Sequence, residues 1–142
     1  MTTKVIKDKV LVENDNFGNI AEMVLSSMLK DSSTHDTTLI SSDKKQITCH
    51  KAVLISNSEV FRSLFSFNNL SKPTIHLNDV KSNELIPLVV FMYTGKIVVT
   101  IRNMKNLIDS ATKLRIFALT QPYLSLARHI LCLTQLLHSF FN

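Results

Sequence analysis

The sequence predicts an α+β fold: one small sheet of short strands surrounded by five or six helices. Glycine is scarce, with only Gly18 and Gly95 among 142 residues. That scarcity disfavours a many-stranded barrel or sandwich and excludes glycine-rich phosphate loops. Short β-branched segments at 36–50 and 74–77 have strand character, whereas most other segments repeat apolar residues at helical spacing. No linker or repeat divides the chain, and its length suits a single domain.

Composition narrows the class of protein further. The chain is 45% hydrophobic and 19% charged, as expected of a globular domain. Cys49 and Cys132 belong to no CxxC pair, and residues 1–12 lack the apolar core of a signal peptide, so a reducing intracellular compartment is expected. The net charge of +5 arises in residues 81–142, which hold seven basic and two acidic groups. No aromatic residue lies between Lys96 and Arg115, which favours a solvated surface over direct contact with nucleic acid.

The first half of the chain begins with a β-prone segment at 5–12, expected to be a short strand or an ordered arm. A helix follows from Phe17, with Asp15 or Asn16 as its cap. Gly18 inside this helix costs about 1 kcal/mol relative to alanine. The apolar face of the helix consists of Phe17, Ile20, Ala21, Val24, Leu25 and Met28.

A β-hairpin is predicted over 36–50, with a polar turn at 42–45. Two short helices then cover 51–57 and 58–67, and Ser58 is the expected cap of the second. The buried stripe of that second helix is predicted to be Val60, Phe61, Leu64 and Phe65.

The second half of the chain starts with a third strand at 74–77. A helix from Ser82 ends at Gly95 in the left-handed conformation. Pro87 indicates that this helix either begins later or bends. A short strand is predicted over 97–101, then a helix capped by Asn103, and a last helix from near Pro122 to about residue 133. We therefore divide the chain into an N-terminal arm or exchange strand (1–14), a folded domain (15–133) and an apolar tail (134–142).

Two stretches carry a family pattern. The first runs from Asp36-Thr-Thr-Leu-Ile through Cys49-His-Lys-Ala-Val-Leu to Ser58-Glu-Val-Phe-Arg-Ser-Leu-Phe, and the second is Phe91-Met-Tyr-Thr-Gly. Over residues 17–131 the chain resembles the BTB/POZ domain family. Residues 72–80 and 82–85 look most like the tramtrack and bric-a-brac group, whose members usually carry DNA-binding elements further along the chain. The departures at Thr37, Cys49 and Glu59 disturb the fold little.

The resemblance implies the BTB/POZ fold, a small mixed sheet of short strands surrounded by five or six helices, and a homodimer. Its first helix packs on that of the partner through Phe17, Ile20, Ala21, Val24, Leu25 and Met28, and an N-terminal strand can exchange between the subunits. Heterodimers with other BTB proteins are a further expectation. The alternative is that Met23, Val24, Met28 and Leu29 face their own core.

Two partner surfaces are also implied by the resemblance. Asp36 and Lys51 match a charged pocket that recruits corepressor peptides in transcription repressors; the alternative is an ordinary exposed pair that contributes under about 1 kcal/mol. A surface for a cullin would combine Arg62, Phe65, Phe67, Leu70 and Tyr93. Lys72 stands where cullin-binding members carry glutamate, which argues against a strong cullin interaction.

The sequence gives little support for catalysis or metal binding. A triad of Ser56, His50 and Asp36 would lack a nucleophile elbow. A metal site of His129, Cys132 and His138 would lack a fourth ligand. We expect no enzyme, no cofactor, no metal and no membrane span, since Arg128, His129 and Gln135 interrupt the apolar tail.

The predicted function is a homodimerising interaction module of the transcription-regulator type, in the nucleus rather than the cytoplasm. The alternative is a substrate adaptor for a cullin-type ubiquitin ligase. The tail at 134–142 is expected either to dock on the dimer or to be a truncation scar.

Overall fold

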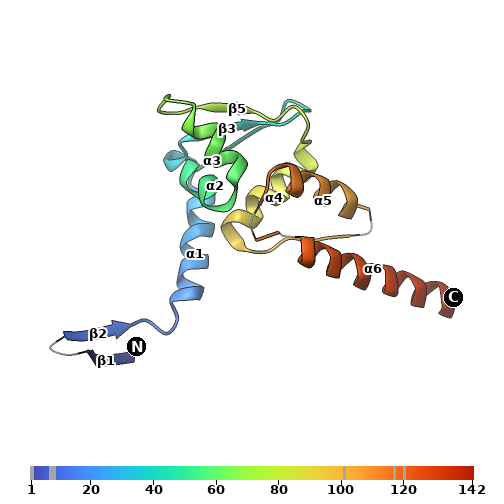
Figure 1. Cartoon of the computed structure of the whole chain (residues 1–142), viewed down its shortest axis with the longest axis horizontal. Helices are drawn as coiled ribbons and strands as arrows, with labels where there is room; N and C mark the ends of the chain where they lie inside the picture. The colour runs from blue at the N-terminus through green and yellow to red at the C-terminus, as the bar shows by residue number, and fades with distance from the viewer. Residues whose placement is uncertain (1, 7–8, 101, 117, 120) are drawn as a thin grey trace.

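The computed structural model describes the backbone of residues 2–6, 9–100, 102–116, 118–119 and 121–142, and the side chains of 14–100, 102–116, 118–119, 129–130 and 132–142. The elements in these ranges are β1 (Thr2–Ile6), β2 (Lys9–Glu13), α1 (Phe17–Lys30), η1 (Ser32–Thr34), β3 (Thr37–Ile40), β4 (Gln46–Cys49), α2 (Lys51–Asn57), α3 (Glu59–Ser66), β5 (Thr74–His76), α4 (Ser82–Thr94), α5 (Met104–Lys113) and α6 (Gln121–Phe141). The α+β class is confirmed. Figure 1 shows the sheet lying over α2 and α3, at the top of the view.

The central sheet is small and mixed. Its strand order is β4-β3-β5, with β3 antiparallel to β4 and parallel to β5. Leu39 of the middle strand is fully buried and stands in register with Ile47 and Ile75. The predicted hairpin and third strand are both confirmed.

Helices α2, α3 and α4 form the core beneath the sheet, with Leu54, Phe61 and Leu85 completely buried. The predicted stripe of α3 is only partly right, because Leu64 is exposed and Val60 is half-buried. The side chains of Phe61 and Phe65, one turn apart, fill the inner face of this helix and stack with ring centroids 6.2 Å apart. The other two positions lie toward its outer face.

Helix α4 begins and ends at the residues that the sequence predicted, Ser82 and Gly95. The helix begins at Ser82 and holds Pro87 inside it, which excludes the first of the two alternatives, a later start. The Ser82 N–H donates to Asp43 Oδ1 at 2.8 Å, a partner from the β3–β4 turn. Gly95 ends the helix with φ 69°, the left-handed conformation predicted for it.

The strand predicted over 97–101 is wrong for residues 97–100, and residue 101 lies outside the described residues. These four residues form no ladder with any described strand. Ile97 and Val99 are half-buried against the core, whereas Val98 is largely exposed. The alternation expected of a strand is therefore present, but none of the described strands lies beside it as a hydrogen-bonding neighbour.

The two ends of the chain also differ from expectation. The β-prone segment predicted at 5–12 belongs to two antiparallel strands, β1 and β2, which pair with each other beyond the start of α1 (Figure 1). Helix α6 continues to Phe141, so the predicted end near residue 133 is wrong. Residues 134–141 extend the same helix because they contain neither proline nor glycine. Among the described residues, no helix is both long and apolar enough to cross a membrane.

Candidate protein-interaction surfaces

Helix α1 presents apolar side chains on two sides. None of its residues is buried. Leu25, Met28 and Leu29 pack partly against the core, whereas Phe17 is 67% and Val24 49% exposed. The remaining predicted interface residues, Ile20 and Ala21, are half-buried.

The alternative, in which this helix faces only its own core, therefore holds for Met28 and Leu29 but not for Met23 and Val24. A helix that is apolar on both sides needs a second surface to cover it. Contacts within the single chain do not explain why position 18 is a glycine, since a Cβ added to Gly18 would meet no atom within 4 Å.

Asp36 and Lys51 are hydrogen-bonded neighbours, but the bond joins the Asp36 side chain to the Lys51 backbone and not to its ammonium group. The Asp36 carboxylate accepts from the Lys51 N–H at 2.7 Å, at the first residue of α2. The Lys51 ammonium instead donates to the Ser71 carbonyl at 3.3 Å. The carboxylate therefore stabilises the start of α2, while the ammonium stays exposed near the chain that leads to β5.

A polar network centred on the buried residues His50 and Tyr93 lies next to this pair. The backbone N–H of His50 donates to the Tyr93 hydroxyl at 2.8 Å, and His50 Nδ1 lies 2.7 Å from the same oxygen. His50 Nε2 lies 2.8 Å from the Thr34 hydroxyl. The His35 ring packs edge-on against His50, with centroids 4.9 Å apart, and its Nε2 lies 3.2 Å from the Met28 carbonyl. The network thus joins the end of α1 to α2 and α4.

Of the five residues predicted to contact a cullin, three are exposed. Phe67 is 88% exposed, and Leu70 and Arg62 are exposed as well. Phe65 and Tyr93 are buried within the single chain, so their side chains do not lie on its surface with the other three. Phe65 packs on Phe61, and Tyr93 is held by His50; burial raises the pKa of the Tyr93 phenol to about 12.

The residues considered for catalysis make structural contacts instead. The Ser56 hydroxyl donates to the Ala52 carbonyl at 2.7 Å, one turn earlier in α2. Asp36 accepts from Lys51, and His50 faces Tyr93 and Thr34. No set of three or more His, Cys, Asp or Glu residues in the described part of the chain is arranged to hold a metal.

Sequence reasoning missed the contacts that join distant segments. The bonds of Asp43 to Ser82 span 39 positions, and those of His50 to Tyr93 span 43. Both His50 and Tyr93 belong to the quoted motifs, which is the one signal that could have paired them. Asp43 is an ordinary turn residue in the sequence and carries no such signal.

The family model for the BTB/POZ domain matches residues 25–131. Protein bric-a-brac 2 of Drosophila melanogaster is 34% identical over 107 residues, which cover 75% of this chain and 10% of that protein. Protein abrupt of the same organism is 31% identical over 95 residues, or 66% and 10% of the two chains. Kelch-like protein 38 of Rattus norvegicus is 26% identical over 124 residues, or 84% and 21%.

Among solved structures, the BTB domain of zebrafish PATZ1 superimposes with a TM-score of 0.63 at 25% identity, covering 75% of this chain and 86% of that one. The chain spans between about a tenth and a fifth of the length of the curated relatives described here. The family match, the mixed sheet and the surrounding helices agree, and the chain belongs to the BTB/POZ domain family.

Proposed function

We propose that the chain is a homodimerising interaction module of the transcription-regulator type, which recruits partner proteins in the nucleus. The observation that carries this proposal is the outward apolar side of α1. Phe17, Met23 and Val24 are exposed on a helix whose opposite side already packs on the core. Burying such side chains against the same helix of a second copy gives a two-fold, self-complementary interface.

Strand exchange is the second part of the proposal. Residues 97–100 have the burial alternation of a strand but no ladder partner among the described strands. Figure 1 shows β1 and β2 apart from the central sheet, beyond the start of α1. In a dimer joined through α1, an N-terminal strand of one subunit would supply the neighbour that 97–100 lack in the other.

The dimer is tested by light scattering at micromolar concentration. We expect a mass of about 32 kDa, twice the 16.1 kDa of the chain. Val24→Asp should give a folded monomer because it places a charge in the apolar contact. Ile86→Asp is the matched control, since Ile86 is 44% exposed against 49% for Val24 but lies near the start of α4. A monomeric parent chain, or a Val24→Asp variant that stays dimeric, would contradict the proposal.

The transcription-regulator type is supported by residues 72–80, which resemble the tramtrack and bric-a-brac group, and by Lys72 in place of glutamate. Under this proposal the exposed Lys51 ammonium and the neighbouring Asp36 carboxylate form part of the site for a corepressor peptide. Heterodimers with other BTB proteins would use the same α1 surface.

A second candidate function, adaptor for a cullin-type ubiquitin ligase, is favoured by the exposed side chains of Phe67 and Leu70. It is tested by binding of a cullin N-terminal domain to the parent chain. Micromolar or tighter binding that Leu70→Asp abolishes and Lys72→Glu strengthens would place this function ahead of the first. If neither the parent chain nor Lys72→Glu binds the cullin domain, the adaptor function is excluded and the transcription-regulator function is retained.

A further inference from the structure

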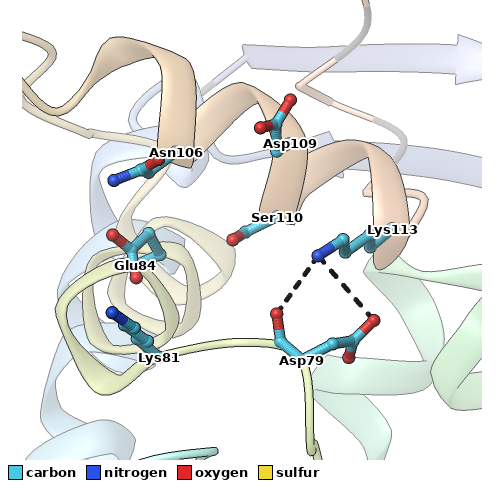
Figure 2. A pocket seen from close by; sticks show the side chains of 7 residues that line it. All are labelled: Asp79, Lys81, Glu84, Asn106, Asp109, Ser110 and Lys113. Atoms are coloured by element: carbon cyan, nitrogen blue, oxygen red, sulfur yellow. Dashed lines mark hydrogen bonds and ion pairs between the residues drawn. The ribbon is translucent and has the colours of Figure 1, made fainter.

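A small polar cavity of about 170 Å³ lies between the start of α4 and the face of α5 that looks toward it. Its lining includes no residue of α1 or α3, so it is separate from the surfaces described above. Figure 2 shows three carboxylates around it, from Asp79, Glu84 and Asp109, together with two lysines, Lys81 and Lys113. Its formal charge is therefore −1 on a chain of net charge +5, which makes it a local acidic site.

Glu84 is the unusual member of this group. Only 9% of this residue is exposed. Its carboxylate forms no hydrogen bond or ion pair with any other described residue. Every side-chain oxygen or nitrogen that is closed off from solvent in the described part of the chain has a partner. The Glu84 oxygens are therefore open to solvent, and Glu84 is one of the residues that line the cavity. Its carboxylate is available there to accept hydrogen bonds from a ligand.

The neighbours of Glu84 do not supply that partner. The Lys113 ammonium lies 3.2 Å from the Asp79 carbonyl and 3.8 Å from Asp79 Oδ2, as the dashed lines in Figure 2 mark. Lys81 forms no ion pair with Glu84 within 4.0 Å among the described residues. The Glu84 carboxylate does not cap the start of α4 either. The first N–H of that helix, from Ser82, donates to Asp43 instead.

We propose that this cavity binds the arginine side chain of a partner peptide. Its guanidinium would donate to the Glu84 carboxylate, with Asp109 as the second anionic group and the Asn106 amide and Ser110 hydroxyl as neutral acceptors. A guanidinium is planar, carries five N–H donors and is more weakly hydrated than an ammonium, so it suits a carboxylate held in a narrow and largely buried position. The cavity is smaller than the roughly 300 Å³ at which cofactor and drug-sized sites begin, and it matches a single side chain better.

The proposal is tested on the full chain by amide NMR titration with the peptide acetyl-Gly-Arg-Gly-amide. The lysine and citrulline peptides of the same length serve as ligand controls. We expect the arginine peptide to shift the resonances of residues 81–84 and 106–113. Glu84→Gln should weaken binding about tenfold, the loss of one charge-assisted contact.

Glu59→Gln is the matched control variant, since it makes the same change of charge on α3, where Glu59 pairs with Arg115. It should leave binding unchanged. Asp109→Asn tests the site at an exposed position in case Glu84→Gln does not fold. Equal binding of the lysine or citrulline peptide, equal weakening by Glu59→Gln, or shifts outside the two segments would overturn the assignment.

Discussion

The Tyr93 hydroxyl is the point at which α2 and α4 are joined. It accepts from the His50 N–H, and with that lone pair in use its own hydrogen can be donated to His50 Nδ1, 2.7 Å away. On the other side of the ring, His50 Nε2 lies 2.8 Å from the Thr34 hydroxyl. One phenol therefore satisfies two buried groups of a single histidine.

Tyr93→Phe is expected to destabilise the fold by about 1–3 kcal/mol, because it leaves the buried N–H of His50 without an acceptor. Urea unfolding at fixed protein concentration measures the change. Ser56→Ala removes an exposed hydroxyl that only bonds within α2, and should alter stability by less than about 0.5 kcal/mol. Equal effects of the two substitutions would show that the His50–Tyr93 contact contributes nothing specific.

The two cysteines should differ sharply in reactivity. Cys49 is fully buried, and burial followed by the charge of Asp36 raises the pKa of its thiol to about 12. Cys132 is exposed. At pH 8 a thiol of pKa 12 carries about a thousandfold less thiolate than an ordinary one. A thiol-reactive chromophore should therefore label one site per native chain and two after unfolding. Native Cys132→Ser should show no labelling, and rapid labelling of that variant would contradict the burial of Cys49.

At the level of elements, the start of α4 depends on a residue from another element. Asp43 Oδ1 accepts from the Ser82 N–H and the Ser41 hydroxyl, and its Oδ2 accepts from the Ser82 hydroxyl. These bonds, that of the Ser82 hydroxyl first, hold the pKa of the Asp43 carboxyl well below its usual range. The β3–β4 turn and α4 are thus held together by one ionised side chain.

Because the folded-state pKa of Asp43 is lowered, its stabilising effect is fully present above the unfolded value of about 3.9 and is lost as the pH falls toward the folded value. Asp43→Asn should lower Tm at pH 7, and the difference from the parent chain should shrink at pH 3. Glu59→Gln, at an exposed ion pair, should change Tm little at either pH. A difference that grows on acidification would have the wrong sign for this mechanism.

Elements with local signals were predictable from the sequence. The Ser58 hydroxyl accepts from the Phe61 N–H at the start of α3, and Gly95 ends α4, both as expected. Elements that depend on contacts with distant segments could not be predicted from the sequence. Residues 97–100 alternate like a strand but pair with none of the described strands, and the pairing of β1 with β2 carries no local signal in the sequence. The Glu84 cavity was also missed, since it forms only when α4 packs on α5.

At the scale of the whole molecule, apolar side chains remain exposed at both ends of the chain. At one end they lie on α1, next to the separate β1–β2 hairpin, and at the other on α6, which extends away from the body in Figure 1. The most exposed of the second group are Leu133, Leu136, Leu137, Phe140 and Phe141. The α1 group has an assigned partner in the proposed dimer, whereas residues 134–142 are all exposed and have none assigned.

Deleting residues 134–142 tests whether this segment docks on the dimer or is a free helical end. Because every side chain in this segment is exposed, its removal deletes no core contact, and Tm should change by less than about 2 °C. Removing the exposed apolar groups should also reduce self-association beyond the dimer, measured by light scattering. Replacing Phe140 and Phe141 by Asn is the matched control, since it keeps the length of the chain and should reproduce the reduced association. A clear fall in Tm on deletion, at equal protein concentration, would show instead that the segment docks on the assembled dimer and contributes to its stability.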